Sequence, residues 1–269
     1  MLRKYCIPPL VSSVAFTIVF CLRAERLESQ QKVLSRIDIS SIEGHMTATP
    51  LNSAKHHRYI VQMEELGDVR RAYVFYKKKN ELQPTSAYAN LWQGVAGAEY
   101  WEESSIYRTD HANIDEPNEL LATIRACFET AAQLDPNSSI VKSEYGFFLW
   151  QRDSQMARGL AMIRAASTKD PKDPLVHYFL GSIYSNHSGN AYSLKNAEQE
   201  LKQAILLAPD YPRSYWCLAS VYADEKRNPE ARKMLLACQH LLPRAYWLTT
   251  RGRIVGKLMA TMNATLSGK

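Results

Sequence analysis

The chain carries a repeated pattern of small and large residues at helical spacing, and each copy of the pattern ends at a proline. A small residue, a large residue and a second small residue stand twelve, eight and five positions before the proline. These spacings place the three residues on one face of a helix, where the large one fills a groove and the small ones admit a neighbouring helix. The proline ends the helix because it lacks an N–H and clashes with the preceding turn. Only Lys79 and Ile124 stand where a small residue is expected. The five copies are Ala72, Tyr76, Lys79 and Pro84; Ile124, Phe128, Ala131 and Pro136; Gly159, Ile163, Ala166 and Pro171; Ala197, Leu201, Ala204 and Pro209; and Ala231, Leu235, Cys238 and Pro243.

A second helical segment precedes each copy, so each unit is predicted to be two antiparallel helices joined by a short turn. One such segment contains the stretch HYFLGSIY, which has a glycine inside an apolar helical pattern. A glycine within a helix costs about 1 kcal/mol relative to alanine. Gly181 stands in register with Ala219 and Gly146, which predicts a packing position where the helix carrying Ala197 and Ala204 comes close.

This pattern of paired helices resembles the tetratricopeptide repeat (TPR) family. The unit at 212–245 has the 34-residue length of the family's repeat, and its signature positions hold Tyr215, Leu218, Ala219, Tyr222, Ala231, Leu235, Cys238 and Pro243. The resemblance covers about 190 of the 269 residues. It implies an all-α, right-handed superhelical solenoid of about five helix pairs. The five units are 53–86, 87–138, 139–173, 174–211 and 212–245.

Three units depart from the family pattern. The first has bulky Ile60 where a small residue is usual, and unit 174–211 has four extra residues in its turn. Unit 87–138 has about 18 extra residues, which include an insert at 104–117. The acidic residues and histidine of this insert match no metal-binding spacing, so a solvated loop is expected, with a partner-contacting loop or a metal site as the alternatives. These residues are Asp110, His111, Asp115 and Glu116.

The segment 246–269 follows the last proline and is predicted to form a capping helix and a tail. A repeat array needs such a cap because its last unit otherwise exposes an apolar face. The apolar positions that suggest an amphipathic closing helix are Trp247, Ile254, Val255, Leu258 and Met262.

The N-terminal segment 1–22 has the form of a signal anchor or transmembrane helix. Arg3 and Lys4 precede residues 5–22, which are 18 residues without a charge. A basic start before an apolar run is typical of secretory signals and signal anchors, and about 20 residues span a membrane. An uncleaved anchor is the preferred interpretation. A cleaved signal and a lipoprotein attached at Cys21 remain as alternatives.

Residues 23–52 are polar and are predicted to be a linker. The short basic tail before the apolar run favours a cytoplasmic N-terminus, with the repeat array on the extracytoplasmic (periplasmic) side. The larger number of basic residues after the run favours the opposite orientation. The first orientation is preferred.

Composition adds few chemical candidates. The chain is 46% hydrophobic and 22% charged with a net charge of +6, which is ordinary for a globular protein. Three consecutive lysines at 77–79 are expected to lie on a solvated face, and no nucleic-acid-binding signature occurs. The five cysteines form no CxxC pair, which argues against a metal site and a disulfide framework.

Enzyme motifs are also missing from the sequence. It has no GxSxG, P-loop or HExxH motif, and no GxGxxG in a suitable context. The seven histidines are scattered, and none pairs convincingly with a nucleophile. We therefore expect no catalytic residues, no metal, no cofactor and no small-molecule substrate.

The TPR resemblance implies that the first helix of each unit lines a concave groove that binds a partner protein or peptide. The repeat register gives the residues expected to point into this groove, many of them aromatic and suited to anchoring an interface. Chaperone-binding members share a carboxylate clamp of lysine and asparagine, but the corresponding positions here hold Leu91, Ser143, Tyr178 and Trp216, which argues against chaperone docking. The predicted groove residues are Tyr88, Leu91, Val95, Phe147, Trp150, Tyr178, Ser182, Ser185, Asn186, Arg213, Trp216, Ser220 and Asp224, with Ser143 and Gln151 beside them.

Three functional hypotheses follow from these observations. The first is a membrane-anchored, non-catalytic scaffold or adaptor that holds partner proteins, in the assembly of an envelope complex. The second is a permanent accessory subunit of a larger membrane protein complex. The third is the non-catalytic domain of an enzyme whose active part is missing.

Overall fold

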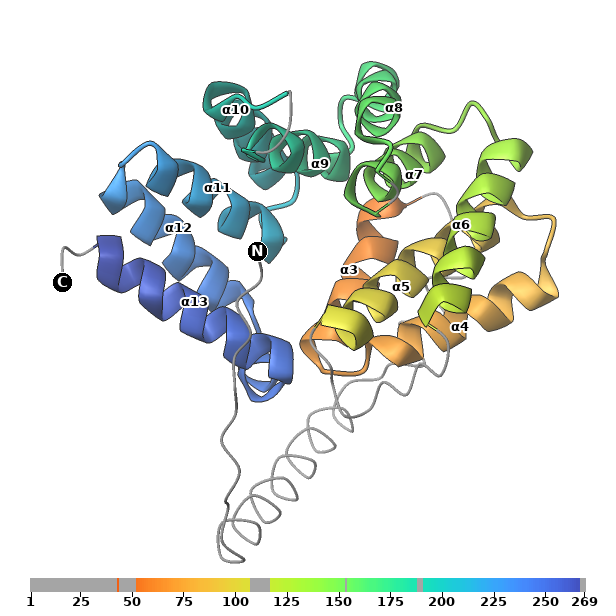
Figure 1. Cartoon of the computed structure of the whole chain (residues 1–269), viewed down its shortest axis with the longest axis horizontal. Helices are drawn as coiled ribbons and strands as arrows, with labels where there is room; N and C mark the ends of the chain where they lie inside the picture. The colour runs from red at the N-terminus through yellow and green to blue at the C-terminus, as the bar shows by residue number, and fades with distance from the viewer. Residues whose placement is uncertain (1–42, 44–51, 107–116, 153, 188–190, 267–269) are drawn as a thin grey trace, which may run out of the picture. The chain divides into compact units, whose positions relative to one another are not determined.

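The computed structural model describes residue 43 and residues 52–106, 117–152, 154–187 and 191–266 (Figure 1). The chain divides into two compact units, Met1–Ile39 and Ser40–Lys269, and all the described residues belong to the second. Within the described residues there are eleven α-helices, one 3₁₀ helix and no strand. The all-α architecture that the repeated pattern predicts is therefore confirmed.

Two helices occupy each of the five predicted repeat units. In every unit the second helix ends two residues before the proline of the repeated pattern, as the sequence predicts. The pairs are α3 (Ser53–Glu65) with α4 (Val69–Leu82), α5 (Ala87–Ile106) with α6 (Pro117–Leu134), α7 (Ser139–Arg152) with α8 (Met156–Lys169), α9 (Pro174–Tyr184) with α10 (Leu194–Leu207), and α11 (Pro212–Asp224) with α12 (Asn228–Leu241).

Local sequence fixes where several of these helices begin. Pro174 and Pro212 each open a first helix, at the position where the missing N–H costs no hydrogen bond. The Asp173 carboxylate accepts a hydrogen bond of 2.9 Å from the backbone N–H of Leu175. Such N-caps satisfy backbone donors that have no partner inside the helix.

The small and large positions of the repeated pattern form the buried face of each second helix. Leu201 and Ile163 are 0% exposed, whereas Lys79, which breaks the rule, is only half-buried. A Cβ atom added at Gly181 would lie 2.5 Å from Cγ of Leu201. The glycine is therefore a packing position, and its close neighbour lies between Ala197 and Ala204 on α10.

The first helices form the inner layer of the described unit. Contacts join α3 to α5, α5 to α7, α7 to α9 and α9 to α11, so each first helix touches the next. Helix α3 also contacts α9 and the 3₁₀ helix η1 (Arg244–Leu248). The start of the array therefore lies close to its end, and this closure brings residues more than 100 positions apart into one site.

The C-terminal cap consists of η1 and α13 (Thr250–Leu266), which lies alongside α12 in Figure 1. Met259 is 6% exposed and packs with Leu235 and Cys238, so the cap covers the last repeat. Of the five predicted cap positions, Trp247, Val255 and Met262 pack against this cluster. Ile254 and Leu258 are instead 39% and 53% exposed, because they lie on other faces of the helix.

The predicted N-terminal anchor at 1–22 lies outside the described residues, as do almost all of the linker at 23–52 and the centre of the insert at 104–117. A search of the described helices for an apolar segment of membrane-spanning length finds none.

Candidate functional site

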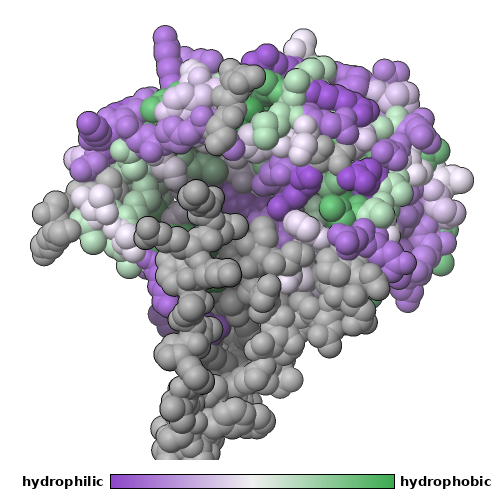
Figure 2. Space-filling model, in the orientation of Figure 1, coloured by the Kyte–Doolittle hydropathy of each residue, from purple (hydrophilic) through white to green (hydrophobic). Residues whose placement is uncertain are grey.

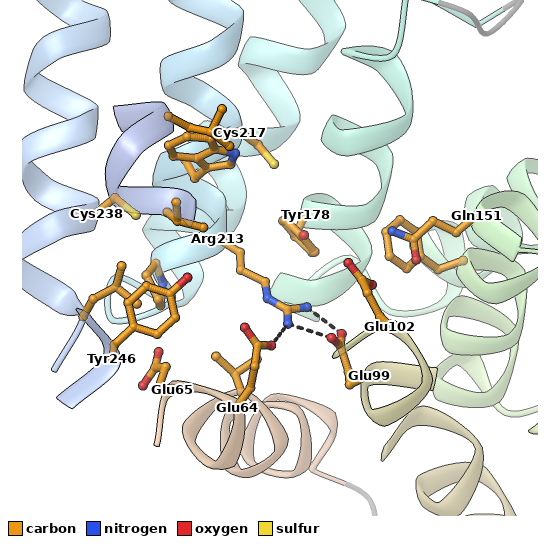
Figure 3. Close-up of a pocket in the computed structure, with 17 residues that line it drawn as sticks. Glu64, Glu65, Glu99, Glu102, Gln151, Tyr178, Arg213, Cys217, Cys238 and Tyr246 are labelled. Carbon is orange, nitrogen blue, oxygen red and sulfur yellow. Dashed lines mark hydrogen bonds and ion pairs between the residues drawn. The ribbon is translucent and has the colours of Figure 1, made fainter. Parts of the chain in front are cut away.

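A pocket of about 230 Å³ lies on the inner side of the array. Its walls come from the first helices α3, α5, α7, α9 and α11, and from α12, η1 and α13 (Figure 3). Figure 2 shows a hollow in this face of the molecule, with hydrophilic and hydrophobic residues around it. The apolar part of the pocket lining is Val61, Phe147, Tyr178, Pro212, Trp216, Leu242, Tyr246, Val255 and Leu258.

The lining follows a simple register within the repeats. Counting from the first residue of each unit, the fifth, ninth and thirteenth positions face inward because they are four residues apart on one helix. Tyr178 and Trp216 hold position five, and Val61 and Phe147 hold position nine. Position thirteen supplies Glu65, Glu99 and Gln151.

Arg213 joins three helices at the centre of the pocket. Its guanidinium donates to both carboxylate oxygens of Glu99, with Nη1 to Oε1 at 2.7 Å and Nη2 to Oε2 at 2.9 Å. It also pairs with Glu64 on α3 (Figure 3). Burial lowers the pKa of Arg213, but the two carboxylates more than offset this and raise it well above its ordinary value. The guanidinium is therefore a permanent cation that links α11 to α3 and α5.

Two further carboxylates line the pocket. Glu65 accepts a hydrogen bond from Arg58 at 3.0 Å, and Glu102 pairs with Arg152. Burial raises the pKa of Glu65 to about 7, although Arg58 opposes the shift. Glu65 is thus partly protonated at neutral pH, and four glutamates share the pocket with a single lining arginine.

The two pocket cysteines are not activated nucleophiles. Burial raises the pKa of the Cys217 thiol to about 11 and that of Cys238 to about 12. Nucleophilic cysteines need a depressed pKa, because the thiolate is the reactive form. Among the described residues no group of histidine, cysteine, aspartate and glutamate side chains is suited to hold a metal ion.

Four of the predicted groove residues come together in this pocket: Phe147, Tyr178, Arg213 and Trp216. Gln151, placed beside them in the sequence analysis, lines it too. These residues come from three different repeats, and their convergence results from the closure of the array.

Other predicted groove residues are buried between helices. Leu91 is 0% exposed, Val95 is 4% exposed and Trp150 is 9% exposed, and Ser143 is 1% exposed. The contacts between successive first helices, α3 with α5 and α5 with α7, cover these side chains. His57 of α3, which also stands at position five, is buried as well, and its Nδ1 lies 3.2 Å from a carboxylate oxygen of Glu144 on α7.

The remaining predicted residues lie outside the pocket lining and are half-buried or exposed. Tyr88 donates to Asp135 at 3.2 Å, and the exposed Asp224 contacts His187 at 2.9 Å. The hydroxyls of two of the three serines donate to nearby backbone carbonyls, Ser185 to residue 182 and Ser220 to residue 216. These contacts are local to one repeat or to adjacent ones. The half-buried members of this group are Tyr88, Ser182, Ser185, Asn186 and Ser220.

The sequence analysis missed the glutamates of the pocket. The register nevertheless contains a signal for two of them, because Glu65 and Glu99 stand at the same repeat position as the predicted Gln151, Asn186 and Asp224. Glu64 and Glu102 have no such signal. Their place in the pocket follows from the closure that brings α3 and α5 to α11.

No protein-family model and no curated protein matches this chain. Solved structures match it in fold. TTC0263, a thermophilic TPR protein of Thermus thermophilus, superposes with a TM-score of 0.52 at 19% identity, covering 77% of this chain and 99% of that one. YrrB, described as a TPR protein with an unusual peptide-binding site, superposes with a TM-score of 0.40 at 15% identity, covering 79% of this chain and 97% of that one. PilW, a type IV pilus biogenesis factor, superposes with a TM-score of 0.46 at 16% identity, covering 80% of this chain and 88% of that one. The chain has a TPR-type fold.

Proposed function

We propose that this chain is a non-catalytic scaffold that binds a segment of a partner protein in the pocket formed by Arg213, Trp216 and the inward faces of the other first helices. The observation that carries the proposal is the pocket itself, in which aromatic side chains from different repeats surround a charged centre. Aromatic and arginine side chains in a partly enclosed pocket are typical of the residues that contribute most to protein interfaces.

A membrane anchor completes the proposal. Its support is the 18-residue uncharged run at 5–22 after Arg3 and Lys4, which suits an anchor that holds the array on the extracytoplasmic side during assembly of an envelope complex. Recovery of the chain with its N-terminus intact in the supernatant of lysed cells, free of membranes, would contradict the anchor.

Trp216→Ala tests partner binding. Trp216 lines the pocket and is half-buried, and it also packs against the cluster of Ala219 and Leu235, so the helical content of the variant is measured as well. The full chain is purified in mild detergent from cells grown on isotope-labelled medium, and co-purifying proteins are quantified by mass spectrometry. We expect the recovery of the specific partner to fall by about tenfold or more, since interface hot spots contribute about 2 kcal/mol or more.

Tyr192→Ala is the matched control, because Tyr192 is an aromatic residue that is 40% exposed and does not line the pocket. It should leave partner recovery unchanged. Equal recovery of the partner with both variants, each retaining its helical circular dichroism spectrum, would contradict partner binding by the pocket. Loss of helicity in Trp216→Ala would assign the residue to the core, and the test would then use Phe147→Ala.

A permanent accessory subunit is the second candidate. Exposed apolar side chains on the second helices favour it, among them Leu206 at 73% and Leu82 at 69% exposure. A fixed partner could cover them. In the same purification, a complex of constant stoichiometry that survives Trp216→Ala would favour this candidate over the scaffold.

A further inference from the structure

The charge of the pocket is opposite to the charge of the chain. The whole sequence has a net charge of +6, yet Glu64, Glu65, Glu99 and Glu102 face the pocket and only Arg213 balances them within the lining. The arginines that pair with Glu65 and Glu102 are not lining residues. Glu65 is partly protonated at neutral pH, so the lining carries the carboxylates of Glu64, Glu99 and Glu102 against the one guanidinium of Arg213.

The pocket already holds one guanidinium. Arg213 contacts Glu99 through two parallel hydrogen bonds of 2.7 and 2.9 Å. This two-pronged geometry is the one by which proteins recognise arginine side chains, and it gives direction as well as charge attraction. The side chain thus shows, within this chain, the kind of group that the inward carboxylates bind.

Glu102 offers a second carboxylate beside this pair. It stands three residues after Glu99 on α5, so both lie on one face of the helix, and Figure 3 shows them close together at the pocket. The aromatic residues Phe147, Tyr178 and Trp216 line the same pocket. Aromatic faces bind the hydrocarbon stems and the charged heads of long cationic side chains.

A buried tyrosine hydroxyl next to the pocket, that of Tyr211, makes no hydrogen bond within the described residues. The ring of Tyr211 packs against Tyr178 with 5.2 Å between centroids, and Tyr211 is 5% exposed. Its buried hydroxyl has no hydrogen-bond partner in the part of the chain that the structure describes. Buried polar groups normally have a partner, so this hydroxyl marks an incomplete polar arrangement beside the carboxylates.

We propose that the pocket recognises an arginine or lysine side chain of an extended partner segment, with the cationic head at Glu102 and the stem against the aromatic part of the lining, Phe147, Tyr178 and Trp216. The proposal rests on the proposed scaffold function and names the chemistry of its partner. Arg152, which pairs with Glu102 from outside the lining, competes with the incoming cation.

The experiment selects peptides on the full-length chain in mild detergent from a phage-displayed library of random peptides. The selected peptides are synthesised with arginine and with citrulline, a neutral analogue of the same shape, and their affinities are measured by fluorescence anisotropy. We expect enrichment of arginine and lysine, and a loss of about tenfold or more in affinity on changing arginine to citrulline. Glu102→Gln should cause a similar loss, and Glu119→Gln, an exposed residue of α6, should cause none.

Arg152→Met provides a variant with the opposite expectation. It removes the guanidinium that pairs with Glu102, so arginine peptides should bind more tightly, whereas damage to the fold would weaken binding. Equal affinity of arginine and citrulline peptides, with binding still lost in Trp216→Ala, would overturn the basic partner and leave the scaffold function standing. Selection of no peptide at all would count against peptide binding by the pocket, and therefore against both proposals.

Discussion

Glu65 shows how burial at one residue can set the response of the whole chain to pH. Its side chain is 2% exposed, and burial raises its pKa from an ordinary 4.5 to about 7. The folded protein therefore holds the proton more tightly than the unfolded chain. The contribution of this group to stability is greatest below pH 4.5 and is lost as the pH rises through 7.

Replacing the carboxyl group by an amide should remove this pH dependence. At a pH of about 8 the ionised, buried Glu65 destabilises the fold by about 3 kcal/mol, which is the size of its pKa shift. We expect Glu65→Gln to melt at a higher temperature than the parent at this pH, and at a similar temperature at a pH of about 4. Differential scanning fluorimetry at the two pH values measures the difference. Glu119→Gln should show no such divergence, and a parallel change in both variants would contradict the assignment.

The pocket carboxylates show the limits of sequence reasoning at this scale. Phe147, Tyr178 and Trp216 could be predicted because they occupy positions five and nine of recognisable repeats, and Arg213 because it stands near the start of a first helix, at position two of its repeat. Glu64 could not, because its role depends on Arg213, which is 149 residues away. A local sequence pattern cannot predict an ion pair that forms only when the array closes.

At the scale of the element, helix pairing depends on a few small residues. Gly181 on α9 meets Leu201 on α10, and a Cβ added there would lie 2.5 Å from Leu201 Cγ. This carbon is a branch point held inside a fully buried side chain, so it cannot move aside cheaply. The intrinsic helix cost of the glycine is thus offset by the close approach of its neighbour.

Gly181→Ala should therefore destabilise the array although alanine is the better helix former. Overpacking costs about 1–3 kcal/mol, and the gain in helix propensity of about 1 kcal/mol offsets only part of it. Gly256→Ala on α13 is the matched control, because its added Cβ would meet Trp247 at an ordinary 3.5 Å. We expect that control to be neutral or stabilising in urea unfolding. A stabilising Gly181→Ala would show that the helices pack less tightly than described.

At the scale of the whole molecule, Arg213 connects the beginning of the array to its end. It pairs with Glu64 and Glu99, which lie 149 and 114 residues earlier in the chain. All three side chains are less than one-fifth exposed. Removing one partner of a buried ion pair leaves an uncompensated charge and typically costs about 3–5 kcal/mol.

Arg213→Met should lower the free energy of unfolding by about this amount and speed hydrogen exchange in α3. Urea unfolding and exchange mass spectrometry measure the two effects. The control is Arg227→Met, because Arg227 also pairs with three glutamates but is 37% exposed and joins only adjacent helices. Exposed pairs contribute about 0–1 kcal/mol, so the control should change little. Equal effects of the two variants would refute the closure role of Arg213.

The sequence by itself determined the elements of this protein and how neighbouring ones pair. Helical periodicity, glycines, alanines and regularly spaced prolines act locally, so the helix pairs and the face that each buries can be inferred without coordinates. Tertiary structure alone decided which inward residues are reached by solvent and which are buried, as the contrast between Trp216 and Leu91 shows. It also decided the charge of the site, because small rotations between successive repeats add up along the array and bring α3 against α9 and η1. That accumulated geometry is a property of all the helix contacts together, and no single stretch of sequence contains it.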